Sequence, residues 1–92
     1  MYKVKPTKKF RKDFKRIASD KKLVDEISVV VDLLSANDNP LPAKYQDHQL
    51  EGKYAVYREC HVRPDWLLVY QKNKNELILL LARTNTHSEI FE

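Results

Sequence analysis

The segment His61–Phe91, HVRPDWLLVYQKNKNELILLLARTNTHSEIF, determines the fold that the sequence predicts. Two mainly apolar stretches, Trp66–Tyr70 and Leu77–Arg83, predict two antiparallel strands. The polar residues Lys72–Asn75 predict the turn that joins them. Leu77–Leu81 is apolar throughout, which is typical of a strand covered on both faces.

A third predicted strand, Tyr54–Val62, precedes this pair across Arg63-Pro64-Asp65. That tripeptide favours a tight turn, because proline fixes φ and aspartate bonds its own backbone. In a three-stranded meander the chain reverses at each turn. The end of the first strand, the start of the second and the end of the third therefore share one edge. The groups expected at this edge are His61, Asp65, Trp66, Arg83 and His87.

The N-terminal half predicts one strand and two amphipathic helices. Tyr2–Lys5 alternates apolar and polar residues and ends at Pro6. Thr7 is the expected N-cap of a helix whose apolar stripe is Phe10, Phe14 and Ile17. A second helix is expected over Lys21–Ser35. The sequence therefore predicts an α+β fold in the order β-α-α-β-β-β, with the helical hairpin packed on a mainly antiparallel sheet and a short C-terminal helical turn.

Composition is that of a small globular protein. The chain has 92 residues, 42% apolar and 33% charged, which predicts a single domain over residues 1–92. No window approaches the ~18 apolar residues of a membrane span, and the charged N-terminus lacks the apolar core of a secretory signal. Cys60 is the only cysteine, so no internal disulfide forms. We expect a cytoplasmic protein without a membrane association.

Charge is concentrated at the N-terminus. Residues 1–22 hold ten Lys and Arg against two acids, whereas residues 23–92 hold seven against eleven. Such a basic face suits nucleic acid or an acidic protein, although many such runs are only solvated helix surface. The residues expected to contact RNA on the first helix are Lys8, Lys9, Arg11 and Lys12.

The shared edge has residues suited to acid–base chemistry. A hairpin end brings His61 and Asp65 within roughly 5–8 Å, and a carboxylate orients an imidazole for proton transfer. More often, such a pair is only a surface histidine near an acid, without a catalytic role. Arg83 offers a bidentate donor to a phosphate, or else forms a structural ion pair. His48 lies in a connection of about 17 residues, long enough to reach the same edge.

Two aromatic residues are expected near this edge. Trp66 or Phe91 could stack on a nucleobase, and Trp66 could equally belong to the core. A metal site is not expected, because the three histidines are 13 and 26 residues apart and no metal-binding spacing occurs. No Gly-rich phosphate loop is present either. These patterns favour metal-free, cofactor-free acid–base chemistry on a phosphate ester.

Three blocks of sequence, Asp47–Gly52, Tyr57–Tyr70 and Arg83–Phe91, resemble in order and spacing the YafQ-like toxins of the RelE/ParE superfamily. The resemblance covers essentially the whole chain and implies a RelE-like fold. One departure is Asn85, where the family pattern Arg-Thr-Gly-Thr-His has glycine. Asparagine tolerates the left-handed conformation better than most residues, so the turn that places His87 can form.

The resemblance implies a type II toxin that cleaves mRNA in the ribosomal decoding site. The implied active site, with Trp66 beside it, consists of His48, His61, Asp65, Arg83, His87 and Phe91. In the expected mechanism a ribose 2′-hydroxyl attacks the adjacent phosphate. His48 is the base, His87 the acid and Arg83 the phosphate ligand, and the two histidines could exchange roles.

The resemblance also implies partners: the ribosome, mRNA and an acidic, DNA-binding antitoxin of the DinJ type in a toxin–antitoxin hetero-oligomer. Two other functions use the same fold. One is a ParE-like toxin that binds DNA gyrase, and the other is a binding module without catalysis. Neither needs a cluster of histidines and acids.

Overall fold

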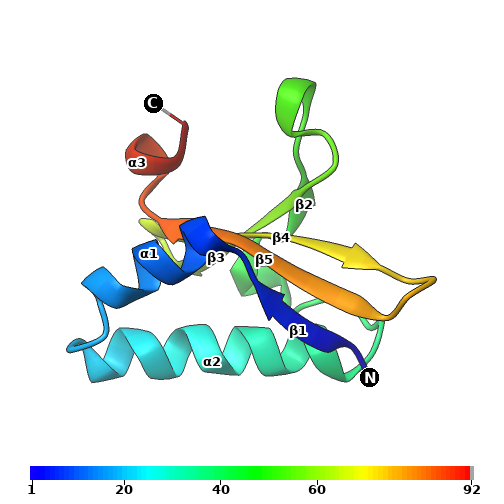
Figure 1. The fold of residues 1–92 in the computed structure, drawn as a ribbon, viewed down its shortest axis with the longest axis horizontal. Coiled ribbons are helices and arrows are strands. Elements are labelled where there is room, and N and C mark those ends of the chain that lie inside the picture. The colour runs from blue at the N-terminus through cyan, green and yellow to red at the C-terminus, as the bar shows by residue number, and fades with distance from the viewer. Residues whose placement is uncertain (92) are drawn as a thin grey trace.

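The strands predicted in the C-terminal half form the centre of a five-stranded sheet in the computed structural model, which describes residues 1–91. The strand order is β1-β5-β4-β3-β2, and only the β1–β5 pair is parallel (Figure 1). The elements in chain order are β1 (Lys3–Pro6), α1 (Lys8–Arg16), α2 (Lys21–Ala36), η1 (Ala43–Tyr45), β2 (His48–Gln49), η2 (Gly52–Tyr54), β3 (Arg58–Arg63), β4 (Trp66–Asn73), β5 (Ile78–Asn85) and α3 (His87–Phe91). The predicted α+β architecture, with two helices and a mainly antiparallel sheet, is confirmed.

β1 forms one edge of the sheet and pairs with β5. It includes Pro6, which the sequence analysis placed just after the strand. Proline is tolerated there because an edge strand can lack one N–H donor. The exposed side chains of Lys3 and Lys5 limit pairing of this edge with other chains.

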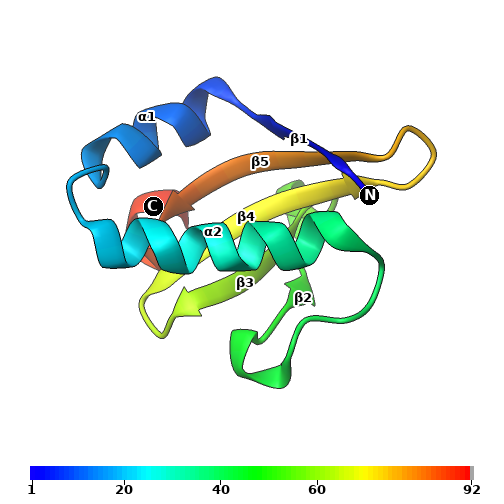
Figure 2. The ribbon, with the colours of Figure 1, turned by 90° about the horizontal axis from the view of Figure 1, so that it is seen from below.

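Both predicted helices form, each with a side chain capping its N-terminus. Thr7 Oγ1 accepts from the Phe10 amide at 3.1 Å, and Asp20 caps α2 in the same way through the Leu23 amide. The buried stripe of α2 lies across the middle strands (Figure 2) and consists of Leu23, Ile27, Val30 and Leu34. α1 lies instead beside β5, near one edge of the sheet (Figure 2). None of the helices in residues 1–91 has the length and apolarity needed to cross a membrane.

Two predicted boundaries were wrong. β3 starts at Arg58 rather than Tyr54, because Gly52, at φ 65°, begins a 3-10 turn that occupies Gly52–Tyr54. The hairpin turn between β4 and β5 lies two residues later than predicted. Asn73 Oδ1 accepts from the amides of residues 75 and 76, so the chain turns only after Asn73, and Leu77 completes the turn at φ 55°.

The long connection after α2 contains structure that the sequence did not predict. Its residues 48 and 49 form β2, the second edge of the sheet, by antiparallel pairing with β3. The Gln49 side-chain amide donates to the carbonyl oxygens of Ala55 and Tyr57 and closes the following loop. The connection therefore brings His48 into the sheet.

The sheet has two differently covered faces. α2 packs on one face, whose core includes Cys60, Leu68 and Tyr70, and burial raises the pKa of the Cys60 thiol. The short α3 covers only part of the other face (Figure 1), where Ile90 packs on Leu67 and Val69. The prediction that Leu77–Leu81 is covered on both faces was therefore wrong. Its residues alternate between buried and more exposed positions, because α3 does not reach this end of the sheet.

The side chain of Asp13 connects α1 to the end of β5 through hydrogen bonds. It is 5% exposed and accepts from Arg83 Nε at 2.7 Å, Arg83 Nη2 at 3.0 Å, the Thr84 amide at 3.1 Å and Asn85 Nδ2 at 3.4 Å. Burial alone would raise the pKa of Asp13, but these donors outweigh it and hold the pKa below the ordinary 3.8.

We predict that Asp13→Asn lowers the free energy of unfolding by about 2 kcal/mol at pH 7, because it breaks a largely buried ion pair. The lowered pKa means that this stabilisation is complete above pH 3.8 and is lost as the pH falls through the still lower native pKa. Urea unfolding between pH 2 and 7 measures both effects. The exposed Asp25→Asn is the control, and equal curves for the two variants would contradict the prediction.

Candidate active site

Strand pairing places four residues in one row across the sheet. His48 on β2 is opposite Glu59 on β3, Glu59 is opposite Val69 on β4, and Val69 is opposite Arg83 on β5. Directly paired residues face the same side of a sheet, and adjacent strands lie about 4.8 Å apart. The backbones of His48 and Arg83 are thus about 14 Å apart on the face that α3 partly covers. The candidate site therefore extends across four strands, from β2 to β5.

A second row joins it on the same face. His61 is opposite Leu67, and Leu67 is opposite Asn85. His61 follows Glu59 by two residues, the repeat that keeps side chains on one face of a strand. The sequence prediction that the strand ends converge at one edge is therefore correct, and β2 adds His48 from outside the meander.

His48, Glu59 and His61 form a cluster. Glu59 Oε2 lies 3.1 Å from His48 Nε2 and 4.0 Å from His61 Nε2. The other ring nitrogens face backbone carbonyls: His48 Nδ1 is 2.8 Å from Gln46 O, and His61 Nδ1 is 3.2 Å from Pro64 O. The side chain of His48 is 50% exposed, that of His61 24% and that of Glu59 only 7%. The cluster therefore has an open side at His48 and a buried carboxylate beneath it.

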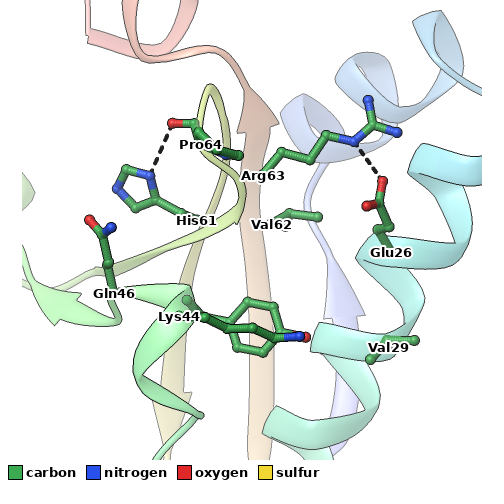
Figure 3. A pocket seen from close by; sticks show the side chains of 9 residues that line it. Glu26, Val29, Lys44, Gln46, His61, Val62, Arg63 and Pro64 are labelled. Atoms are coloured by element: carbon green, nitrogen blue, oxygen red, sulfur yellow. Dashed lines mark hydrogen bonds and ion pairs between the residues drawn. The ribbon is translucent and has the colours of Figure 1, made fainter.

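Asp65 does not orient His61 as predicted. It lies exposed in the Pro64–Asp65 turn, and among the bonds of residues 1–91 His61 is held by the Pro64 carbonyl instead (Figure 3). A cavity of about 600 Å³ opens beside this turn towards α2, and the ion pair between Arg63 and Glu26 lines it (Figure 3). Asp65 remains at the site edge, free to contact a substrate.

The other half of the site surrounds α3. His87 and Phe91 lie one turn apart with ring centroids at 4.9 Å, and the Tyr54 ring meets Phe91 edge-on at 5.1 Å. A hollow of about 330 Å³ beside them is lined by Tyr54, Phe91 and Arg83 and, from α1, by Lys8. Half-buried aromatic rings next to cationic side chains are suited to a nucleotide.

Arg83 forms the structural ion pair that was one of its two possible roles in the sequence. Its Nε and Nη2 are paired with Asp13, which raises the pKa of the guanidinium. Its side chain is still 25% exposed and lines hollows that contain Lys8, Lys9 and Lys12 of α1. Arg11 points elsewhere, to a hollow with Phe10 and Phe14.

Trp66 is oriented by the core. It packs against the cluster under α2, and its Nε1 donates to Thr84 Oγ1 at 2.8 Å. Thr84 Oγ1 in turn donates to Leu67 O. The indole thus packs on the α2 side of the sheet, away from the face of the two rows, and Phe91 is better placed to stack on a base.

Asn85 helps to position His87, but not through the left-handed backbone conformation that the sequence suggested. Positive φ occurs within residues 1–91 only at Gln46, Gly52 and Leu77, so Asn85 is not left-handed. Instead its Oδ1 accepts from the Thr86 amide at 2.8 Å while its Nδ2 reaches Asp13. The side chain therefore links the start of α3 to α1.

A polar network on the opposite face holds β2 in place. Asp47 accepts from Tyr70 Oη at 2.6 Å and from Arg58 Nη2 at 3.2 Å. Burial, together with this bond to Asp47, raises the pKa of Tyr70. This network explains why Arg58 occupies the apolar side of β3, and it anchors the residue before His48.

Sequence reasoning assigned no role to Glu59, Tyr54 or Asp13. The signal for Glu59 was its position two residues before His61 on the same strand face. The sequence pattern predicts Tyr54 in a strand, and it shows Asp13 only as one acid in a basic helix.

The whole chain matches a known family. Residues 2–92 fit the family model described as a bacterial toxin of type II toxin–antitoxin systems, YafQ. The protein belongs to the YafQ toxin family. An mRNA interferase toxin YafQ of Escherichia coli K12 is 38% identical over 82 residues, covering 89% of this chain and 87% of that protein.

Solved structures of similar proteins share the fold. YafQ in the E. coli DinJ–YafQ complex superposes with a TM-score of 0.87 at 34% identity, covering 100% of both chains. A metal-bound toxin from Helicobacter pylori superposes with a TM-score of 0.89 at 42% identity, covering 99% of this chain and 100% of that one. In residues 1–91 of the present YafQ-family toxin, no group of three or more His, Cys, Asp or Glu side chains is arranged to hold a metal ion.

We predict that Asp47→Asn loosens β2 without unfolding the toxin. The neutral amide binds Arg58 and Tyr70 more weakly than the carboxylate does, and the expected loss is about 1–2 kcal/mol. Hydrogen exchange should accelerate at residues 46–49 and remain unchanged in α3. Asp32→Asn, on the solvent side of α2, is the control, and unchanged exchange in β2 would show that Asp47 does not anchor it.

Proposed function

We propose that this toxin is a ribosome-dependent endoribonuclease that cleaves translated mRNA. The observation that carries the proposal is the polar face of the sheet, where His48, His61 and Arg83 share two adjacent rows and His87 stands above them on α3. The E. coli relative named an mRNA interferase supports the same reaction class.

Cleavage of a phosphate ester by a neighbouring 2′-hydroxyl needs three groups. A base removes the hydroxyl proton, an acid protonates the departing 5′ oxygen, and a cation stabilises the phosphoryl oxygens. His48 and His87 come from opposite borders of the site and can serve as the acid–base pair. Both N–H groups of Arg83 Nη1 and one of Nη2 remain for the phosphate, since Asp13 accepts only from Nε and from the other N–H of Nη2. The mechanism uses side chains alone and needs no cofactor.

Binding is divided between the aromatic and the basic parts of the site. Phe91, supported by Tyr54 and His87, offers a face for a nucleobase. Lys8, Lys9 and Lys12 supply positive charge from α1 next to Arg83, where the RNA backbone would run. At the opposite border of the site, His61 and Asp65 orient the reacting groups or stabilise charge.

The ribosome supplies what so small a site lacks. The hollows around the site are open, so the toxin alone holds few atoms of a flexible RNA. Cleavage requires the 2′ oxygen, the phosphorus and the 5′ oxygen in line, and a ribosome that fixes the mRNA provides that orientation. The reaction then takes place in the cytoplasm, where translation occurs.

The partner in resting cells is an acidic antitoxin of the DinJ type. The E. coli YafQ chain is found in complex with DinJ, and the basic exposed face of α1 here is complementary to an acidic chain. An antitoxin that covers α1 and the site would block both the ribosome and mRNA within a toxin–antitoxin hetero-oligomer.

We predict that His87→Ala reduces cleavage of mRNA on programmed ribosomes by about 10²–10⁴-fold, the usual contribution of one acid or base. Ser88→Ala, the exposed neighbour on α3, is the matched control and should cleave like the wild type. Ribosome-free mRNA should remain intact.

Other results would identify another function. Cleavage of free mRNA at the same rate would remove ribosome dependence. A folded wild-type toxin that cleaves nothing but inhibits DNA gyrase would be a ParE-like toxin. Inhibition of growth by His87→Ala equal to that by the wild type would indicate binding without catalysis.

A further inference from the structure

The hollow beside α3 has the size and the lining of a small-molecule site. Its volume is about 330 Å³, near the lower end of the range of roughly 300–1,000 Å³ for such sites. The lining includes two buried aliphatic residues, Val69 and Ile90, and three half-buried aromatic rings, those of Tyr54, Tyr57 and Phe91. A lining of this kind is suited to a flat ring such as a nucleobase.

The rings of Tyr54 and Phe91 stand nearly at a right angle. Their centroids are 5.1 Å apart, and the angle between their planes is 82°. A base that stacks on one of these rings would therefore meet the other ring edge to face, and both arrangements are favourable for aromatic pairs. The two side chains together can contact one base from two directions.

The loop that carries Tyr54 is fixed by its own backbone and by β2. The Ala55 amide donates to Gly52 O at 3.1 Å, and the Tyr57 amide donates to Tyr54 O at 2.9 Å. The side-chain amide of Gln49 donates to the carbonyl oxygens of Ala55 and Tyr57. Tyr54 is therefore held in place before any ligand binds, so little conformational entropy would be lost on binding.

Cationic side chains line the same hollow. Arg83 and, from α1, Lys8 and Lys9 contribute to it. The pKa of the Arg83 guanidinium is raised mainly by its hydrogen bond to Asp13, and Tyr54 lies close enough to raise it further through its charge. A phosphate bound by Arg83 would therefore lie next to the aromatic rings. The hollow thus offers contacts for both parts of one nucleotide, its base and its phosphate.

We propose that Tyr54 and Phe91 together bind one nucleobase of the mRNA, the base next to the scissile phosphate, and that Tyr54 is a substrate-binding residue. This inference rests on the ribonuclease function proposed above. It gives the loop between β2 and β3 a role in substrate binding, because η2 places Tyr54 opposite α3 across the hollow. In this arrangement the stacked base fixes the position of the neighbouring phosphate at Arg83.

The first test removes the base and the tyrosine ring in turn. Single-turnover cleavage on programmed ribosomes is measured with mRNAs that have an abasic ribose at one or the other nucleotide flanking the scissile phosphate. The wild type should cleave one of these two mRNAs about 5- to 150-fold more slowly, the usual contribution of one stacked base. Tyr54→Leu should cleave the intact mRNA with a loss in the same range, and the abasic ribose should slow this variant no further.

Two variants serve as controls for this test. Tyr54→Phe keeps the ring, and Val56→Ala changes a side chain that is 60% exposed in the same loop. Both should cleave the intact and the abasic mRNAs as the wild type does. Melting temperatures show whether each variant is folded, and the abasic mRNAs test the hollow without any change to the protein.

The second measurement does not depend on cleavage. An mRNA that lacks the attacking 2′-hydroxyl carries 5-iodouracil at either flanking position and is bound with the toxin on programmed ribosomes. Irradiation joins this base to an aromatic side chain that contacts it. We expect a cross-link to Tyr54 in the wild type and in Val56→Ala, and no cross-link within residues 54–58 of Tyr54→Leu.

Three outcomes would overturn the inference: equal cleavage of the intact and both abasic mRNAs by the wild type, a further loss when an abasic ribose is combined with Tyr54→Leu, or no wild-type cross-link to Tyr54. A wild-type toxin that cleaves no mRNA would instead overturn the ribonuclease function. The cross-link would then still decide whether a base occupies the hollow.

Discussion

The register of β4 against its two neighbours determines where each candidate functional group lies. Side chains alternate between the faces of a strand, so a slip of one residue would exchange the faces. In the observed register Cys60 and Leu68 are fully buried against α2, while Glu59 and His61 face the other side. The slipped register would put those polar groups into the core. Burial of apolar residues under α2 therefore also holds the site together.

Much of this arrangement could be predicted from the sequence, because β3, β4 and β5 are consecutive and joined by short turns. The pattern from Trp66 to Tyr70 and the Arg63–Asp65 turn leave few alternatives to a meander. β2 could not be predicted in the same way. A strand of two residues has no periodicity of its own, and His48–Gln49 is a strand only because β3 offers an edge to pair with.

The site was partly predictable for the same reason. Arg83, His87 and Phe91 are close in sequence, so placing the end of β5 placed all three. Asp13 is 70 residues from Arg83. Nothing in a helix of basic residues marks Asp13 as the buried partner of Arg83. The same limit applies to Asn85. Its tolerance of a left-handed backbone was the property visible in the sequence, whereas its two side-chain bonds depend on α1 and α3 being in place.

Arg83 connects stability with chemistry. Its pairing with Asp13 fixes the guanidinium plane beside α3, so a phosphate would meet an oriented donor and little side-chain entropy would be lost on binding. The same pairing offsets most of its charge. In the proposed function, the positive potential that attracts RNA would therefore come mainly from the exposed lysines of α1. In such a site the lysines of α1 would attract the RNA, and the sheet would orient the groups that contact the phosphate. The ribosome dependence proposed above agrees with this arrangement, because a substrate that is already held in place needs few contacts from the toxin.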